Sequence, residues 1–271
     1  MSTQNQNSKI VLVTGGSRGI GKSIALNAAK RGIDVILTYN NNSDQGEAVA
    51  NAINNNGGKA IALKLDTSKT STFSSFADQV SQVLRKEWNR DSFDYLVNNA
   101  GISQRTLIKD TTEGMFDELV DVNFKGVFFL TQKLIDQLAD GGQIINISSG
   151  LARFAFPGVA VYGALKSAIE GLTRYFAKEY AGRKIRVNSV APGAIDTEFG
   201  GGKGDDAHRN QIASMTALGR LGEAEDVGAF VASLLSEHSR FVNAQRMRCQ
   251  VVCLFKLMKR SVIVRSSYVS N

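Results

Sequence analysis

Cysteine is scarce in this chain of 271 residues, which contains only two, both near its end. So low a count argues against a disulfide framework and fits a reducing cytoplasm. No stretch approaches the ~20 apolar residues that span a bilayer, and residues 1–8 are polar and lack a hydrophobic signal core. We therefore expect a cytoplasmic protein, long enough to bury a sizeable core and without a membrane segment.

Acidic residues are missing from residues 246–271, a segment that holds six of the 32 basic residues of the chain. That segment carries almost all of the net charge of +7, so residues 1–245 are nearly neutral. A near-neutral main body gives no basis for nucleic-acid binding. The change of composition at Arg246 predicts a main domain over residues 1–245 and an atypical basic tail over residues 246–271.

Short apolar runs alternate with helical patterns along the main domain. We expect strands at residues 10–14, 34–39, 59–65, 93–97, 143–147 and 184–190. Helical patterns follow these runs and end near residues 31, 56, 88, 138, 180 and 235. This alternation predicts an α/β fold with a doubly wound parallel sheet, the Rossmann fold, in a single domain. Ligands of such sheets bind at the carboxyl ends of the strands.

The first predicted strand runs into a glycine-rich turn that a helix follows, Gly15-Gly16-Ser17-Arg18-Gly19-Ile20-Gly21. At that position bare backbone lets a pyrophosphate approach, and the free N–H groups of the helix face it. The spacing is Gly-x-x-x-Gly-x-Gly and not the Gly-x-Gly-x-x-Gly of the common dinucleotide fingerprint. The turn and its place between strand and helix together indicate a dinucleotide site.

The end of the second predicted strand indicates which dinucleotide binds. NAD-binding proteins carry an acid there that grips the ribose 2′-hydroxyl, but this chain has Tyr39, Asn40 and Asn41 instead. Arg18, inside the glycine-rich turn, offers a cation. A missing acid and a present arginine favour a 2′-phosphate, hence NADP over NAD; the alternative is that Arg18 is merely solvated.

Later strands also end in small or polar residues. Asp66 follows the third strand, where we expect it near the adenine end of the ligand. Asn98-Asn99-Ala100-Gly101 follows the fourth strand, and Pro192-Gly193 ends the sixth. Residues 193–218 are glycine-rich and polar, which is typical of a mobile lid or binding loop. All these residues would share one edge of the sheet.

Asn123 lies inside an otherwise apolar helical stretch. A buried amide is costly unless it is hydrogen-bonded. Asn123 is therefore either a structural hydrogen-bonding residue or a site residue, and the sequence favours neither.

Tyr162 and Lys166 stand four residues apart, so a helix projects both from one face. An ammonium group one turn away favours the phenolate and lowers the pKa of the tyrosine. Ser149, shortly before this helix, offers a hydroxyl that could hold a substrate oxygen, which predicts an acid–base site for moving a proton on or off an oxygen. The alternative is an amphipathic helix that happens to carry Tyr and Lys.

Together these motifs resemble the short-chain dehydrogenase/reductase family, in its single-domain branch. The resemblance covers roughly residues 9–245 and rests on motifs in the order of the family: Thr14–Gly21, Asn98–Gly101, Asn123, Ser149, Tyr162-x-x-x-Lys166, Pro192-Gly193 and Thr197. It implies an oxidoreductase that transfers a hydride between NADP(H) and a carbonyl or alcohol substrate. It also implies that the protein forms a homotetramer or homodimer. We expect no metal site.

The resemblance implies a role for each matching residue. Tyr162 would exchange the proton with the substrate oxygen, Lys166 would hold the nicotinamide ribose and lower the pKa of Tyr162, and Ser149 would orient the substrate. Asn123 would anchor a proton relay to Lys166. The implied cofactor contacts are Gly15, Ser17, Arg18, Gly19, Ile20, Gly21, Asn40, Asp66, Asn98, Ala100, Gly101, Tyr162, Lys166, Pro192, Gly193, Ile195 and Thr197.

The chain departs from the family pattern at its end, where a seventh strand followed by a glycine-containing turn is usual. From Arg246 onward the sequence contains no glycine. The tail could be an amphipathic segment that touches membranes, or Cys249 and Cys253 could form half a metal site. We favour a third hypothesis, in which a shifted reading frame or a truncation has replaced the last strand.

Two further classes of function remain open beside the reductase. One is an NAD(P)-binding regulatory protein without turnover, or an inactive product of the disrupted C-terminus. The other is a sugar epimerase or dehydratase of the extended branch, which needs a larger C-terminal substrate region than this chain has after Gly193.

Overall fold

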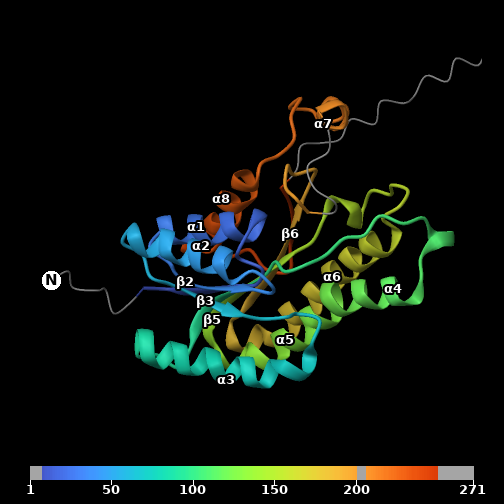
Figure 1. Cartoon of the computed structure of the whole chain (residues 1–271). Helices are drawn as coiled ribbons and strands as arrows, with labels where there is room; N and C mark the ends of the chain where they lie inside the picture. Colours follow the sequence, from blue (N-terminus) through green and yellow to red (C-terminus); the bar gives the residue numbers. More distant parts are fainter. Residues whose placement is uncertain (1–7, 200–205, 250–271) are drawn as a thin grey trace, which may run out of the picture.

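A seven-stranded parallel sheet forms the centre of the computed structural model, which describes residues 8–199 and 206–249 (Figure 1). The strands lie in the order β3-β2-β1-β4-β5-β6-β7, and each neighbouring pair is parallel. The order reverses between β1 and β4, so the predicted doubly wound Rossmann fold is confirmed. The strands are β1 (Ile10–Val13), β2 (Asp34–Tyr39), β3 (Ala60–Lys64), β4 (Phe93–Asn98), β5 (Leu138–Ile147), β6 (Arg186–Pro192) and β7 (Arg246–Cys249).

Helices cover both faces of the sheet (Figure 1). One layer contains α1 (Gly19–Lys30), α2 (Ser43–Asn55) and α8 (Ala224–Leu234). The opposite layer contains α3 (Phe73–Val83), α4 (Glu113–Val120), α5 (Gly126–Leu134) and α6 (Ala160–Glu179), while α7 (Asp206–Ser214) stands apart from both. Short 3-10 turns lie at η1 (Thr70–Thr72), η3 (Ile108–Asp110), η5 (Ile135–Gln137), η6 (Gly150–Ala152), η7 (Tyr180–Arg183) and η8 (Glu237–Ser239).

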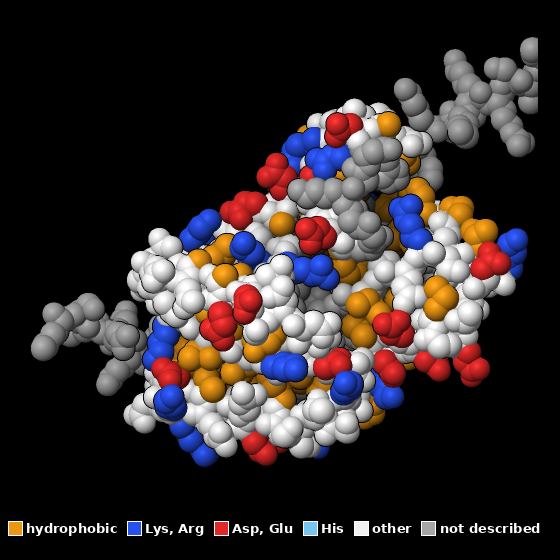
Figure 2. Space-filling view, viewed as in Figure 1, with side chains coloured by type: hydrophobic (Ala, Val, Ile, Leu, Met, Phe, Trp, Pro, Cys, Tyr) orange, Lys and Arg blue, Asp and Glu red, His pale blue; other side chains and the backbone are white. Residues whose placement is uncertain are grey.

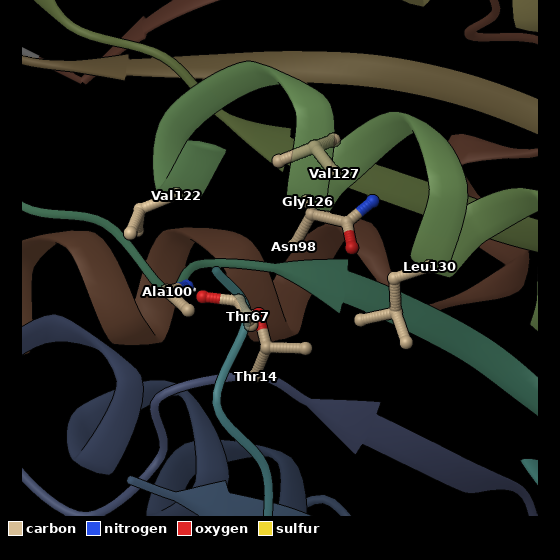
Figure 3. A pocket seen from close by; sticks show the side chains of 8 residues that line it. All are labelled: Thr14, Thr67, Asn98, Ala100, Val122, Gly126, Val127 and Leu130. Carbon is tan, nitrogen blue, oxygen red and sulfur yellow. Dashed lines mark hydrogen bonds between the residues drawn. The ribbon is translucent and has the colours of Figure 1, made fainter. Parts of the chain in front are cut away.

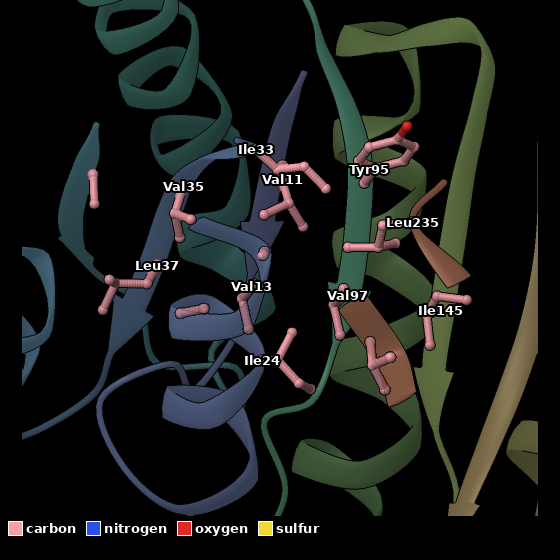
Figure 4. Packing of buried hydrophobic residues seen from close by; sticks show 14 of the residues in the cluster. Val11, Val13, Ile24, Ile33, Val35, Leu37, Tyr95, Val97, Ile145 and Leu235 are labelled. Atoms are coloured by element: carbon pink, nitrogen blue, oxygen red, sulfur yellow. The ribbon is translucent and has the colours of Figure 1, made fainter. Parts of the chain in front are cut away.

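Buried apolar side chains fill both interfaces between sheet and helices. Successive residues of β1 point to opposite faces: Val11 and Val13 pack with α1 and α8, whereas Ile10 and Leu12 join the cluster under α3, α5 and α6. Figure 4 shows the first cluster, in which side chains of neighbouring strands meet Ile24 of α1. Because both faces are covered, β1 and most of β2 are apolar. The strands β4, β5 and β6 also bury polar side chains, among them Asn98, Asn146 and Asn188.

Two predicted helices contain π turns. The pattern over residues 112–138 divides into α4 and α5 at η4 (Asp121–Lys125), and the helix that begins with α3 ends in η2 (Leu84–Trp88). A π turn adds a residue without changing which residue types are apolar, so the sequence pattern does not reveal it. The turn at η4 places Asn123 in the interior, where it is 0% exposed.

The expected loss of the last strand from Arg246 onward is wrong. Arg246–Cys249 forms β7, which pairs in parallel with β6 from Ser189 to Pro192. Ser189 N donates to Gln245 O at 2.8 Å, and Gly193 N donates to Cys249 O at 3.2 Å. Backbone groups make these bonds, so the unusual side chains of this segment do not prevent the pairing. The predicted boundary before Arg246 thus falls inside the sheet.

The rest of the tail lies outside the described residues, including Cys253 and the segment for which a membrane contact was considered. Within residues 8–199 and 206–249, none of the helices combines the length and the apolarity that crossing a bilayer requires.

Candidate active site

A long cleft follows the carboxyl ends of β1, β2, β4, β5 and β6, as the sheet topology predicts. Residues from distant parts of the sequence line it, among them the glycine-rich turn, the end of β2, Ala100-Gly101, Ser149, Tyr162 and Lys166. On the face shown in Figure 2, basic and acidic side chains are interspersed with apolar ones. This pattern agrees with the near-neutral charge of the main domain.

The glycine-rich turn forms one wall of the cleft and needs glycine for its shape. Gly15 and Gly19 have φ of 64° and 53°, a conformation that favours glycine. A Cβ on Gly21 would lie 2.1 Å from Gly15 O, so only glycine lets α1 start this close to the turn. Within the described residues, no side chain caps the N-terminus of α1 and its first turn holds no acid, which leaves N–H groups for an anion.

The residues predicted to choose between NADP and NAD lie together along this wall. Asn40 directly follows β2 and lines the cleft with Arg18. Arg18 is exposed, and its Nη1 lies 3.7 Å from Glu198 Oε2. A salt bridge this exposed is weak, so the guanidinium can turn to another anion. Asp66 lines the same part of the cleft, and its carboxylate accepts hydrogen bonds from the amide and hydroxyl of Ser68.

Asn98 differs from its neighbours, because its side chain points into the interior instead of lining the cleft. Its Nδ2 donates to Asn146 Oδ1 at 2.9 Å and to Thr131 Oγ1 at 3.1 Å. It lines a much smaller cavity under the floor of the cleft, between β4 and η4 (Figure 3). The side chain of Asn98 therefore has a structural role in the interior, and a cofactor contact through the backbone of this segment stays a prediction.

Asn99 and Thr14 hold the loop after β4 against the glycine-rich turn, a function that the sequence analysis missed. Asn99 Nδ2 donates to Thr14 O at 2.9 Å and to Gly15 O at 3.1 Å. Thr14 Oγ1 accepts from the amides of Asn99 and Ala100, each at 3.0 Å. These bonds fix Ala100 and Gly101 at the cleft. Thr14 and Asn99 belong to motifs that the sequence analysis matched to the family, Thr14–Gly21 and Asn98–Gly101, and this could have indicated their role.

The structure brings Ser149, Tyr162 and Lys166 together on the opposite wall. Ser149 follows β5, while Tyr162 and Lys166 lie one turn apart on α6 and are 7% and 4% exposed. Lys166 Nζ lies 5.5 Å from the centre of the Tyr162 ring and donates to Ile147 O at 3.0 Å. An amphipathic helix that carries Tyr and Lys by chance would expose their polar groups to solvent. Instead, α6 buries Tyr162 and Lys166 beside Ser149.

Burial, and not the ammonium group, dominates the titration of this pair. Burial raises the pKa of Tyr162 above its usual value, and a hydrogen bond with Ser149 lowers it by less. Burial also lowers the pKa of Lys166 to about 8. The expectation that Lys166 lowers the pKa of Tyr162 stays a prediction; in this structure desolvation disfavours both charged forms.

The two adjacent serines have different partners, which distinguishes them. Ser149 Oγ accepts from Leu151 N at 3.1 Å and lies near enough to Tyr162 to lower the pKa of that phenol. Ser148 Oγ faces away, 2.9 Å from Glu170 Oε1 and 3.2 Å from Lys166 O. The geometry thus supports the choice of Ser149 for the site.

Asn123 uses its side chain within the protein interior. Its Nδ2 donates to Leu119 O and Ile102 O, both at 3.0 Å, and its Oδ1 accepts from Ile102 N at 3.3 Å. A Cβ on Gly101 would lie 3.0 Å from this Oδ1 and 3.6 Å from Lys166 Nζ. Asn123 is thus a structural hydrogen-bonding residue that also lies behind the site, next to the glycine that separates it from Lys166.

The segment after β6 closes the cleft and differs from the irregular loop that we expected. It contains α7, and Asp196 forms a bidentate pair with Arg209 of that helix, with both distances at 2.6 Å. Residues 200–205 lie outside the described residues. Pro192, Gly193, Ile195 and Thr197, all predicted cofactor contacts, line the cleft.

Apolar side chains form the part of the cleft next to Tyr162. The ring of Phe199 lies 5.8 Å from that of Tyr162, centre to centre. The sequence analysis missed this contact, because an aromatic residue in a loop has no periodicity to mark it. Other apolar residues line the same cleft, among them Ile102, Met115, Leu151, Phe154, Phe156, Ile212 and Met215. Within the part of the chain that the structure describes, no cluster of His, Cys, Asp and Glu could hold a metal ion.

Known proteins resemble the chain over most of its length. The family model described as Enoyl-(Acyl carrier protein) reductase matches residues 15–250. A 3-oxoacyl-[acyl-carrier-protein] reductase FabG of Staphylococcus epidermidis is 37% identical over 240 residues, 88% of this chain and 95% of the relative. A short-chain type dehydrogenase/reductase of Picea abies is 36% identical over 89% of this chain and 90% of its own length.

Solved structures show the same similarity. The landomycin C-6 ketoreductase LanV with bound NADP and rabelomycin has a TM-score of 0.84 and 32% identity, covering 92% of this chain and 98% of its own. A blue fluorescent protein from a metagenomic library in complex with NADPH has a TM-score of 0.83 and 31% identity, covering 93% and 100%.

Proposed function

The chain belongs to the short-chain dehydrogenase/reductase family, and we propose that its Ser149, Tyr162 and Lys166 reduce a carbonyl group with NADPH. Membership makes it an NAD(P)-dependent oxidoreductase that acts on C=O and CH–OH groups. The observation that carries the residue assignment is the buried Tyr162, which lies beside Ser149 and one turn from Lys166 at the cleft.

The residues along the cleft fit a dinucleotide. Gly15, Gly19 and Gly21 leave a cradle that a Cβ would fill, and the N-terminus of α1 opens toward it. Arg18 and Asn40 would receive a 2′-phosphate, and Lys166 would hold the nicotinamide ribose. Structural relatives with NADP or NADPH in their names support the preference for NADP over NAD. When bound, this cofactor supplies the hydride.

The three catalytic residues would act on the substrate oxygen. Ser149 Oγ donates a hydrogen bond to the carbonyl oxygen and orients it. Tyr162 Oη gives its proton to that oxygen as a hydride reaches the carbon, so that a C–H and an O–H bond form while the C=O π bond breaks. Because burial raises the pKa of Tyr162, the phenol is protonated at neutral pH and suits the reductive direction. Lys166 Nζ offsets the charge left on the phenolate.

Asn123 would act behind these groups. We propose that it fixes the backbone around Ile102 and Gly101, beside which a water-linked proton relay reaches Lys166. The amide contacts Ile102 on one side, and Gly101, which has no side chain, lies between Asn123 Oδ1 and Lys166 Nζ.

The substrate would be a small molecule with a carbonyl next to an apolar group. Phe199 beside Tyr162 and the other apolar side chains of the cleft favour such a group over a polyol. A 3-oxoacyl-[acyl-carrier-protein] reductase and a ketoreductase among the relatives support a ketone or an acyl thioester. We further propose that the protein acts in the cytoplasm.

The protein would assemble as a homotetramer or homodimer through α4, α5 and α6. Phe116, Phe129 and Tyr175 of these helices are 47%, 39% and 70% exposed, which is unusual for aromatic residues of a single chain. Light scattering coupled to gel filtration tests this proposal, and a monomer at all concentrations would contradict it.

A spectrophotometric assay tests the enzymatic proposal. The purified chain is mixed with a panel of ketones and acyl thioesters, and oxidation of NADPH or NADH is followed. We expect turnover with at least one apolar carbonyl compound and a higher kcat/KM for NADPH. Tight NADPH binding without turnover on any compound would instead favour a regulatory protein.

A further inference from the structure

Arg246, the first residue of β7, reaches from the edge of the sheet to the segment that carries Ser149. Its side chain is 9% exposed and forms an ion pair with Glu170, whose side chain is equally buried. Arg246 Nη2 also lies 3.3 Å from the backbone oxygen of Ser149, to which it donates. One guanidinium group thus contacts both α6 and the backbone of a catalytic residue.

Glu170 continues this connection toward Lys166. It lies one turn after Lys166 on α6, and its Oε1 is 2.9 Å from Ser148 Oγ. The same hydroxyl lies 3.2 Å from the backbone oxygen of Lys166. Arg153 is only a distant second cation, exposed and 3.9 Å from Glu170 Oε2. Arg246 is therefore the principal counter-charge of a buried carboxylate inside the catalytic wall.

The fold of β7 does not require this side chain. Backbone groups pair β7 with β6, and Met247 and Cys249 pack against the core on the opposite face of the strand. A buried ion pair contributes little net stability, because desolvation offsets the attraction between the charges. Removal of one partner, however, leaves an unpaired charge beside Ser148 and Ser149. The ion pair between Arg246 and Glu170 is therefore better suited to fixing the position of Ser149 than to stabilising the sheet.

We infer that Arg246 is a positioning residue, which holds Ser149 in register with Tyr162 and Lys166 through Glu170 and through the Ser149 carbonyl. This inference rests on the proposed function, in which Ser149 must place a substrate oxygen beside Tyr162. A displacement of about 1 Å in such a group costs roughly 100-fold in rate. The first residue of the tail that the sequence marks as foreign would then be part of the support of the active site.

Steady-state kinetics of Arg246→Met, Glu170→Gln and the double variant test the inference. Methionine keeps the apolar length of the side chain but removes the cation. We expect kcat with the best ketone to fall roughly 10- to 100-fold in each single variant, with the KM for NADPH changed less than about twofold. The double variant should be no slower than Arg246→Met, because both changes break the same connection.

A change in pH profile separates positioning from simple loss of folded protein. In Arg246→Met the buried carboxylate of Glu170 loses its principal counter-charge, so we expect the pH dependence of kcat to differ from that of the original chain. Arg246→Lys should restore most of kcat and the original profile. Arg240→Met, which removes an exposed arginine shortly before β7, serves as the matched control and should behave like the original chain.

Hydrogen exchange tests the same inference without turnover. In Arg246→Met the amide of Leu151, which donates to Ser149 Oγ, should exchange faster. The amide of Thr14, which donates to Val97 O in the other wall, should not change. Equal acceleration at both amides, or none, would overturn the inference, as would an unchanged kcat and pH profile. Absence of turnover in the original chain would overturn the proposed function instead, and the exchange data would still decide this inference.

Discussion

One wall of the cleft is made by β1, α1 and β2, and the other is made by β5 and α6, which β7 supports from the edge of the sheet. The two walls are built differently. Backbone forms the first wall, where Gly15, Gly19 and Gly21 leave no side chain between a ligand and the start of α1. Buried polar side chains form the second, where Lys166 and Glu170 lie within the interior. One wall depends on the absence of side chains and the other on their mutual contacts.

This difference determines how each wall tolerates change. The backbone wall should fail when a side chain is added at Gly21, because a Cβ there would lie 2.1 Å from Gly15 O. The side-chain wall should fail when a partner is removed, because a buried polar group without a partner is costly. Variants in the two walls should therefore affect different measurable quantities, cofactor affinity in the first and the chemical step in the second.

The largest effect is expected in the side-chain wall, from Tyr162→Phe. Loss of the phenolic proton donor should lower kcat by about 100- to 10,000-fold. The Kd of NADPH, measured by fluorescence titration, should change little, because the ring that packs beside Phe199 remains. A variant that keeps most of its turnover would show that another group transfers the proton.

The next effect is a pH dependence of stability that burial of Lys166 produces. The pKa of Lys166 is 10.5 in the unfolded chain and is lowered to about 8 in the fold. From about pH 8 to 10.5 the unfolded chain therefore binds a proton that the folded chain has released, so the free energy of unfolding rises with pH. Below that range the full cost of burying the charge remains, about 3 kcal/mol.

Chemical unfolding of the cofactor-free protein and of Lys166→Met checks this sign. The original chain should gain stability relative to the variant as pH rises through the window, and the gain should be lost again as pH falls through about 8. Parallel pH curves for the two proteins would mean that Lys166 is solvated.

In the backbone wall, Gly21→Ala should be damaging although it adds only one methyl group. The new Cβ would meet Gly15 O at 2.1 Å and Asn99 Nδ2 at 2.4 Å, so the turn and the loop after β4 must move apart. We expect a loss of about 1–3 kcal/mol of stability and a weaker affinity for NADPH. Gly114→Ala in α4 is the control: nothing lies within 4 Å of its Cβ, and it should stabilise by up to about 1 kcal/mol.

The smallest effect is expected from Arg18→Ala at the exposed rim of the same wall. Loss of the guanidinium should raise the KM for NADPH roughly tenfold, as the removal of one charged hydrogen bond does, and leave the KM for NADH nearly unchanged. Arg31→Ala, an exposed arginine at the other end of α1, should change neither constant. Equal effects on both cofactors would remove Arg18 from recognition of the 2′-phosphate.

The sequence predicted the backbone wall more completely than the side-chain wall. The bounds of β2 and the glycine-rich turn agree with the structure because both follow from local patterns of apolar residues and glycine. Asn98 belongs to a motif that indicates the cleft, yet its amide turns inward to Asn146 on the neighbouring strand. The motif predicted the position of the backbone at the cleft, but not that the side chain of Asn98 would be buried in the interior.

The sequence by itself determined the Rossmann fold, the edge of the sheet that carries the cleft, and the pairing of Tyr162 with Lys166 on one helix face. These features depend on residues that are close in the chain. Only the tertiary structure decided that burial governs the pKa of both residues, that Arg246 begins a strand, and that it meets Glu170. Arg246 and Glu170 are 76 positions apart, and packing of the whole sheet, not a local preference, brings such partners together.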